Sequence, residues 1–212
     1  MALNIFITDN RLQFSRSLAE MLKNNGDTVC ISSETHPNAD RPLREIYWNR
    51  KSPFSLQSLH LELKNLNITI DAVIFIFDGP AYIDLYQKDD IAGIDTTVTD
   101  LISANMSLAY VFSKFFLKQN RGKFIFIHRE IATGQSNAPL AAASGAFIRM
   151  AEEVVHSMIK EESPHLQTLL VKLEGTEDDS FIQWITTQLS LPVLTRSPGR
   201  WIRAGQRGFF GK

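Results

Sequence analysis

Short apolar segments alternate with longer amphipathic segments along the chain. The stretch NIFIT (4–8) precedes a segment at 12–25 whose apolar residues share one side, and Gly26 then ends that segment. These two patterns predict a strand and a helix. We expect further strands at 28–32, 44–49, 71–79, 122–128, 167–173 and 199–204, and further helices at 53–66, 97–119, 139–161 and 179–190.

The segment DAVIFIFDG (71–79) is apolar without alternation, which indicates a strand buried on both faces, as in a parallel sheet. Repeated strand–helix–strand units predict a Rossmann-like, doubly wound parallel sheet of about seven strands in a three-layer α/β/α domain that spans 1–212. Ligands of such sheets bind beyond the carboxyl ends of the strands. In this chain those ends follow residues 8, 32, 77, 128 and 173.

Composition excludes several functional classes. The 212 residues carry a net charge of −1, so no electrostatic footprint for nucleic acid or an anionic membrane stands out. Cys30 is the single cysteine and is expected to be a small buried residue. The five histidines show no metal-ligand spacing, so we expect no metal site. No signal segment and no membrane-spanning run is recognisable, which predicts a cytoplasmic protein.

The order of segments resembles the short-chain dehydrogenase/reductase (SDR) family over nearly the whole chain. FITDNRLQFSRSLAEMLKNNGDTV is similar to the family's first strand, glycine turn and first helix, and DAVIFIFDGP to its strand that ends in Asn-Asn-Ala-Gly. ANMSLAYVFSKFFLKQNRGKFIFIH resembles the fourth helix and fifth strand, and AFIRMAEEV the helix that carries a Tyr-x-x-x-Lys pair.

The cofactor motifs of that family are altered in this chain. The family turn reads Thr-Gly-x-x-x-Gly-x-Gly; Thr8 is kept, but Asp9, Gln13 and Ser15 replace the glycines. These glycines allow the backbone to approach a pyrophosphate closely, and Asp9 adds a charge that repels the anion. Of the Asn-Asn-Ala-Gly motif only Gly79 is kept. We therefore expect no dinucleotide cofactor in this chain.

The catalytic motifs are altered as well. The resemblance places the family's tyrosine and lysine at Asn137 and Ala141, and its serine at Arg129, whereas Asn105 matches the family's asparagine. Neither Asn137 nor Ala141 supports acid–base chemistry at neutral pH. After strand 167–173 the next helix follows almost at once, which predicts that the family's substrate lid is shortened.

The surface of two predicted helices suggests a partner. In the SDR family the fourth and fifth helices of two subunits form a four-helix interface, and the matching segments here are rich in aromatic residues and in small residues, respectively. The small residues could equally pack against the chain's own sheet, and the aromatic C-terminal tail could fold back on its own core. The predicted interface residues are Tyr110, Phe112, Phe115, Phe116, Ala142, Arg149, Trp201, Phe209 and Phe210.

Three functional hypotheses follow. In the preferred one the chain is a catalytically inactive, cofactor-free SDR-like subunit that supports an active SDR dehydrogenase or ketoreductase, which binds NAD(P) and has hydroxyacyl-CoA or ketoacyl-CoA compounds as candidate substrates. Heteromeric family members imply a heterotetramer; a self-dimer is the other assembly. The alternatives are an atypical NAD(P)-dependent reductase that uses His128, Tyr82 or Tyr86 as its acid, and a ligand-sensing regulatory protein.

Overall fold

The described residues form one parallel sheet of seven strands. The computed structural model describes residues 2–35, 43–65, 69–88, 90–160, 165–194 and 199–205. The strand order across the sheet is β3-β2-β1-β4-β5-β6-β7, and every neighbouring pair is parallel. The strands are β1 (Asn4–Ile7), β2 (Thr28–Ser33), β3 (Arg44–Tyr47), β4 (Ala72–Asp78), β5 (Gly122–Arg129), β6 (Leu166–Leu173) and β7 (Trp201–Arg203).

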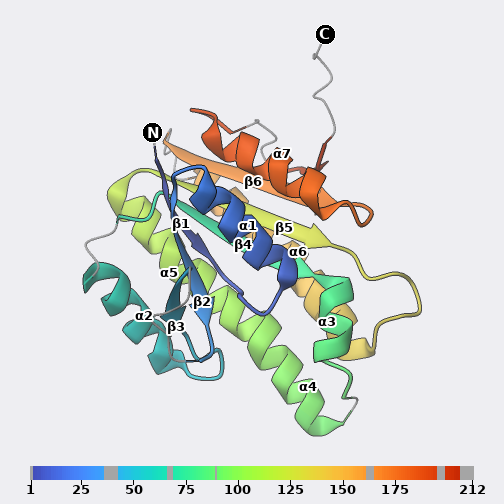
Figure 1. The fold of residues 1–212 in the computed structure, drawn as a ribbon. Coiled ribbons are helices and arrows are strands. Elements are labelled where there is room, and N and C mark those ends of the chain that lie inside the picture. The colour runs from blue at the N-terminus through green and yellow to red at the C-terminus, as the bar shows by residue number, and fades with distance from the viewer. Residues whose placement is uncertain are drawn as a thin grey trace.

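Helices cover both faces of this sheet (Figure 1). Helices α1 (Gln13–Asn24) and α7 (Asp178–Ser190) pack side by side on one face. The other face carries α2 (Pro53–Asn65), α5 (Ala104–Gln119) and α6 (Ala138–Lys160). Helices α3 (Gly79–Leu85) and α4 (Ile91–Thr97) follow β4. The predicted Rossmann-like fold is thereby confirmed.

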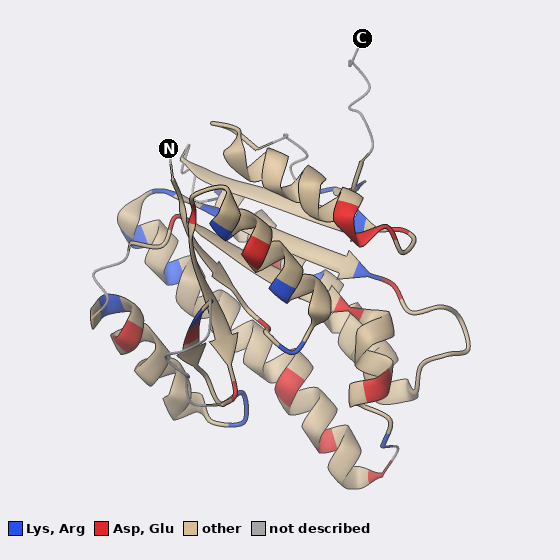
Figure 2. Ribbon diagram, viewed as in Figure 1, with Lys and Arg blue, Asp and Glu red and all other residues tan. Residues whose placement is uncertain are grey.

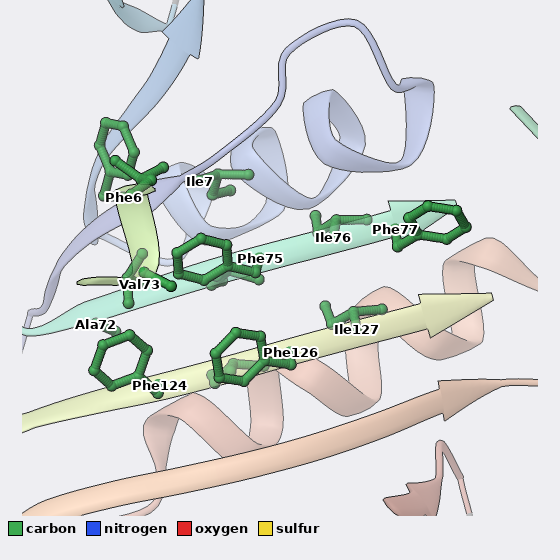
Figure 3. Close-up of a cluster of buried hydrophobic side chains, with 14 of the residues drawn as sticks. Phe6, Ile7, Ala72, Val73, Phe75, Ile76, Phe77, Phe124, Phe126 and Ile127 are labelled. Carbon is green, nitrogen blue, oxygen red and sulfur yellow. The ribbon is translucent and has the colours of Figure 1, made fainter. Parts of the chain in front are cut away.

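The centre of the core lies along β4 and β5 (Figure 3). Every residue of β4 is buried, and the rings of Phe75 and Phe126 on adjacent strands stack with centroids 5.1 Å apart. Because helices cover both faces, side chains on either side of these strands leave water, which explains the uninterrupted apolar sequence. Cys30 is buried in the same core, as expected.

The segment after β4 differs from the sequence prediction. The helix expected to start near residue 97 begins at Ile91, where the Asp90 carboxylate accepts a hydrogen bond of 2.7 Å from the Gly93 N–H. It continues through η1 (Val98–Ser103), a π-helical stretch, into α5. The sequence also gave no indication of α3, because seven residues present too few apolar positions for helical periodicity to be recognised.

The connection after β6 is short, as predicted. Strand β6 ends at Leu173 and α7 begins at Asp178, with Asp178 and Asp179 in its first turn. Acidic residues at this place favour the helix because they face its positive N-terminal dipole. None of the helices in the described ranges is both long and apolar enough to cross a membrane.

Candidate functional site

The turn that follows β1 contains a buried carboxylate in place of a glycine. Asp9 Oδ1 accepts a hydrogen bond of 2.9 Å from Arg11 Nε, and Asp9 Oδ2 accepts one of 2.8 Å from Arg11 Nη2. The hydroxyl of Tyr82, on α3, donates to the same Oδ2 at 2.8 Å. The polar turn before α1 is therefore shaped by a carboxylate–guanidinium pair rather than by bare backbone.

A second arginine reaches this carboxylate from the far side of β2. Arg50 follows β3, and its Nη2 donates to the carbonyl oxygen of Thr8 and lies 3.4 Å from Asp9 Oδ2. Its guanidinium also stacks on the Trp48 ring, 4.4 Å from the ring centroid. Strand β2 separates β3 from β1, and adjacent strands lie about 4.8 Å apart, so only a long side chain can span this distance.

Further contacts extend these pairs into one network. Arg11 Nη1 donates to the Tyr86 hydroxyl at 2.8 Å, and that hydroxyl donates to Asp100 Oδ2 at 3.2 Å. We call this network the Asp9 cluster; its members are Asp9, Arg11, Arg50, Tyr82, Tyr86 and Asp100. Glu34, at the end of β2, lies at its solvent side, with its Oε1 3.6 Å from Arg11 and 3.7 Å from Arg50.

The two arginines decide the charge of the cluster. Burial alone would raise the pKa of Asp9, but the positive charges of Arg50 and Arg11 and the hydrogen bonds from Arg11 hold it well below its usual range. Burial, with Asp9 beside it, raises the pKa of Tyr82 well above its usual value. Asp9 is therefore ionised and Tyr82 protonated at neutral pH, and the cluster has the charges that its hydrogen bonds require.

A separate ion cluster lies at the ends of β4 and β5. Arg129 Nη1 lies 3.3 Å from Asp78 Oδ2, and Arg129 Nη2 pairs with Asp178 at the start of α7. The guanidinium also lies over the Phe14 ring, 5.4 Å from its centroid. We call Asp78, Arg129 and Asp178 the Arg129 cluster. Figure 2 shows a basic position at the tip of β5 and acidic positions at the start of α7.

The other predicted cofactor positions differ in their surroundings. Gln13 is exposed at the start of α1 and donates to the Ser17 hydroxyl at 3.2 Å, whereas Ser15 is buried. Gly79 is needed for a close approach, because a Cβ there would lie 2.8 Å from the Arg129 carbonyl oxygen. The glycine that matches the family motif is thus required for packing in this chain.

The four predicted catalytic positions hold no acid–base pair. Asn105 donates through its Nδ2 to the Leu101 carbonyl oxygen at 2.9 Å, and Asn137 donates to the Tyr86 carbonyl oxygen at 2.9 Å. Ala141 is exposed on α6, and Arg129 belongs to its ion cluster. Each side chain that can form hydrogen bonds here is held by this chain's own groups.

His128 is a core residue, and its side chain lies on the face of β5 opposite to that of Arg129. Its Nε2 is 2.8 Å from the Ser144 hydroxyl on α6, and its ring stacks on Phe77. The hydrogen-bond partner of the His128 ring is therefore a serine of α6 and not a carboxylate. Burial, followed by the nearby charge of Lys172, lowers the pKa of His128 to about 4.

The predicted interface residues differ in their exposure. Phe112 and Phe116 are 2% and 0% exposed in this chain's own core, so their assignment to an interface is wrong. Tyr110, Ala142 and Arg149 are exposed, and Phe115 is half-buried. Trp201 is half-buried and donates to Glu152 Oε1 at 3.1 Å, and Phe209 and Phe210 lie outside the described residues.

One crevice borders Arg50 of the Asp9 cluster. This crevice of about 90 Å³ lies between the start of α2 and η1–α5, with Trp48, Arg50 and Ala104 among its lining residues. Pockets for drug-sized ligands measure about 300–1,000 Å³. Within the ranges that the structure describes, no three His, Cys, Asp or Glu side chains are grouped so that they could hold a metal ion.

Sequence reasoning missed Arg11, Arg50 and Asp100. A signal for Arg50 was present, because it directly follows the strand predicted at 44–49 and so belongs to a carboxyl end that was not considered. The sequence predicted Tyr82 and Tyr86 as possible acids of a reductase, not as members of a network with Asp9. The contact between Tyr82 and Asp9 joins residues that are 73 positions apart in the sequence.

Comparison with solved structures defines the fold class. An SDR of Leptospira borgpetersenii with bound NAD+ aligns with a TM-score of 0.73 and 11% identity over 96% of this chain and 91% of that chain. A metagenomic short-chain oxidoreductase in complex with NADP aligns with a TM-score of 0.73 and 10% identity over 96% and 98%. The chain therefore has the fold of the short-chain dehydrogenases/reductases.

Sequence comparison identifies the family more narrowly. An uncharacterized protein of Treponema pallidum (strain Nichols) is 50% identical over 214 residues, which cover 100% of this chain and 97% of that protein. The chain belongs to the same family as this protein. No protein-family model matches the sequence.

Proposed function

We propose that this protein is a catalytically inactive subunit with the SDR fold, which binds no NAD(P) itself and assembles with an active SDR dehydrogenase or ketoreductase. The active partner would bind NAD(P), and hydroxyacyl-CoA and ketoacyl-CoA compounds are its candidate substrates. The observation that carries this proposal is the Asp9 cluster, which lies beyond the end of β1, at the edge where this class of sheet binds its ligands.

The charge of Asp9 and the buried ion pairs around it both support the absence of a cofactor. A pyrophosphate placed at the start of α1 would meet the ionised Asp9, and its approach to the backbone would require Arg11 and Arg50 to leave a buried ion pair. Removing one partner from a buried pair costs about 3–5 kcal/mol. A dinucleotide would have to supply this free energy before it gained any affinity.

The reductase alternative lacks an accessible acid. Tyr82 and His128 are each 1% exposed, and their polar groups are bonded to Asp9 and Ser144, respectively. Burial is the main cause that raises the pKa of Tyr86 above its usual value, which opposes loss of its proton. A general acid must come within hydrogen-bond distance of its substrate, and these side chains are held away from solvent by their own partners.

An exposed apolar surface supports the assembly part of the proposal. Ile91, Ile94 and Val98 on α4 and η1, and Met106 and Tyr110 on α5, are exposed. Within each of these two groups the residues are three or four positions apart, a spacing that places neighbours on one side of a helix. On the adjacent α6, Ala141, Ala142 and Gly145 are exposed and would let a partner helix approach closely. We define these eight residues as the assembly surface.

Titration calorimetry with NAD(H) and NADP(H) tests the first part. We expect no binding at ligand concentrations up to about 1 mM and no turnover of acyl-CoA compounds by the chain alone. Thermal shift with the same acyl-CoA compounds addresses the ligand-sensing alternative. A dinucleotide dissociation constant in the micromolar range would refute a cofactor-free subunit.

Co-expression with an intact SDR paralogue tests the second part. We expect the two chains to elute together in size-exclusion chromatography, at a mass that corresponds to a heterotetramer. Separate elution of the two chains with every intact paralogue of the same genome would refute the assembly proposal, whatever the result with dinucleotides.

A further inference from the structure

The buried side chain of Arg50 contacts several elements of the fold. Its side chain is 2% exposed. Besides its contacts with Thr8, Asp9 and Trp48, its Nη1 donates to the Asp100 carbonyl oxygen at 3.2 Å and lies 3.4 Å from Asn105 Oδ1. One guanidinium therefore joins the end of β1, the β3–α2 connection, η1 and the start of α5.

The π-helical stretch explains how Arg50 finds acceptors inside a helix. In η1 the backbone pairs five residues apart, as the Ala104 N–H does with the Thr99 carbonyl oxygen. At such a stretch the regular four-residue hydrogen bonding is interrupted. Two side-chain donors reach carbonyl oxygens here: Arg50 donates to Asp100 and Asn105 donates to Leu101. The Arg50 side chain thus takes part in the hydrogen bonding of the continuous helix formed by α4, η1 and α5.

We infer that Arg50 is a built-in ligand, a positioning residue whose guanidinium holds the β1–α1 turn and η1 in one arrangement without any bound nucleotide. This inference rests on the proposed function, because η1 and α5 carry Val98, Met106 and Tyr110 of the assembly surface. Arginine stays protonated at any physiological pH, so this internal ligand is present permanently. The assembly surface is thereby ordered independently of the cellular supply of dinucleotide.

Replacing Arg50 and returning a free guanidinium ion tests this inference on the full chain. We expect Arg50→Ala to lower the melting temperature by about 10 °C, as for a broken buried ion pair in a chain of this length. Guanidinium chloride at 10 mM should restore several degrees, because a ligand that binds only the folded state stabilises it, whereas 10 mM sodium chloride should not. Arg121→Ala is the matched control, since Arg121 is 60% exposed and pairs with Asp71.

Hydrogen–deuterium exchange separates a positioning role from a general loss of stability. In Arg50→Ala the amides of residues 98–105 should exchange at least about tenfold faster relative to those of β4, and guanidinium should reverse this difference. Arg121→Ala should leave the ratio unchanged. If the melting temperature fell by less than 2 °C, or if amide exchange were accelerated equally in η1 and β4, the inference would be overturned.

If Arg50→Ala does not fold, Arg50→Lys is the variant that decides. Lysine keeps the charge and loses the planar fork that serves several acceptors at once. We expect it to fold with a lower melting temperature and with the same selective acceleration of exchange at 98–105. A lysine variant indistinguishable from the wild type would overturn the inference. Because these measurements need neither a dinucleotide nor a partner chain, their failure is separate from failure of the proposed function.

Discussion

Asp9 lies buried at the end of β1 and accepts hydrogen bonds on both carboxylate oxygens. A buried charge is tolerated only when it is paired and its hydrogen-bonding capacity is satisfied. Tyr82 is the neutral member of this arrangement, and Arg11 and Arg50 are the charged members. At the scale of single residues, each partner of Asp9 should contribute to the free energy of unfolding.

Tyr82→Phe removes one donor and changes little else. The hydroxyl donates to Asp9 Oδ2 at 2.8 Å in a buried setting, and hydrogen bonds to charged groups contribute about 1.5–3 kcal/mol. We expect the free energy of unfolding in urea to fall by about 2 kcal/mol. Tyr110→Phe is the control, because Tyr110 is 65% exposed, and it should change the value by less than about 0.5 kcal/mol. Equal effects of the two substitutions would contradict the role of Tyr82.

Because His128 is buried, we expect the protein to lose stability in mild acid. Its pKa is lowered from 6.5 to about 4, so between these values the unfolded chain binds a proton that the folded chain does not. Stability therefore falls as pH falls through this window, by up to about 3 kcal/mol from this residue. We expect His128→Phe to have a flatter profile of unfolding free energy between pH 6.5 and 4.

Urea unfolding at a series of pH values measures this profile. His60→Phe, at an exposed position on α2, should keep the wild-type slope. Asp9 affects stability at lower pH. Because its pKa is depressed in the folded chain, it adds stability above about pH 4, and this stability is lost as pH falls further. The His128→Phe variant should therefore still unfold in acid below that pH. If His128→Phe and the wild type had the same slope above pH 4, the histidine would not be buried in its neutral form.

At the scale of elements, two helical glycines have opposite surroundings. Gly79 begins α3 against β5, where a Cβ would lie 2.3 Å from Ile131 Cγ1 and 2.8 Å from the Arg129 carbonyl oxygen. Gly145 lies within α6, where a Cβ would meet nothing within 4 Å. The first glycine is required by packing inside this chain. The second is not, which agrees with a surface kept free for another helix.

Replacing glycine with alanine should therefore change the free energy of unfolding in opposite directions at the two sites. We expect Gly79→Ala to reduce the free energy of unfolding by about 2 kcal/mol, because the backbone of β5 must move. Gly145→Ala should raise it by about 0.5–1 kcal/mol, since alanine favours a helix interior over glycine. Urea unfolding followed by circular dichroism measures both. A destabilised Gly145→Ala variant would show that the chain itself needs this glycine.

At the scale of the whole molecule, two ion clusters lie at the edge of the sheet where the strands end. The Asp9 cluster covers the ends of β1 and β3, and the Arg129 cluster covers those of β4 and β5. The apolar assembly surface lies on helices of one face of the same sheet. Under the proposed function, the apolar face is the part of the molecule that would contact a partner.

Charges placed on that face should prevent association. We expect Met106→Asp and Tyr110→Asp to weaken binding to the co-expressed SDR at least about 100-fold, because an unpaired charge buried at an interface costs several kcal/mol. Phe54→Asp is the control: Phe54 is 77% exposed on α2, outside the assembly surface. Size-exclusion chromatography with light scattering measures the complex. Loss of binding in the control alone would place the contact elsewhere.

The strands and longer helices were predictable because burial leaves a local pattern in the sequence. The uninterrupted apolar run of β4 and the amphipathic pattern of α1 each fit inside a window of a few residues. Prediction failed where the pattern changes its period. The π-helical turns of η1 alter the angle between successive residues, so regular helical periodicity does not extend from α5 back to Ile91.

The sequence by itself determined a parallel sheet with helices on both faces and the loss of the glycines that a dinucleotide needs, because both depend on residues close together in the chain. Only the tertiary structure decided which side chains surround Asp9. Asp9, Arg50 and Tyr82 meet because the order of strands, rather than the order of residues, brings their elements together. A side chain that must span a neighbouring strand can be recognised only once that strand order is known.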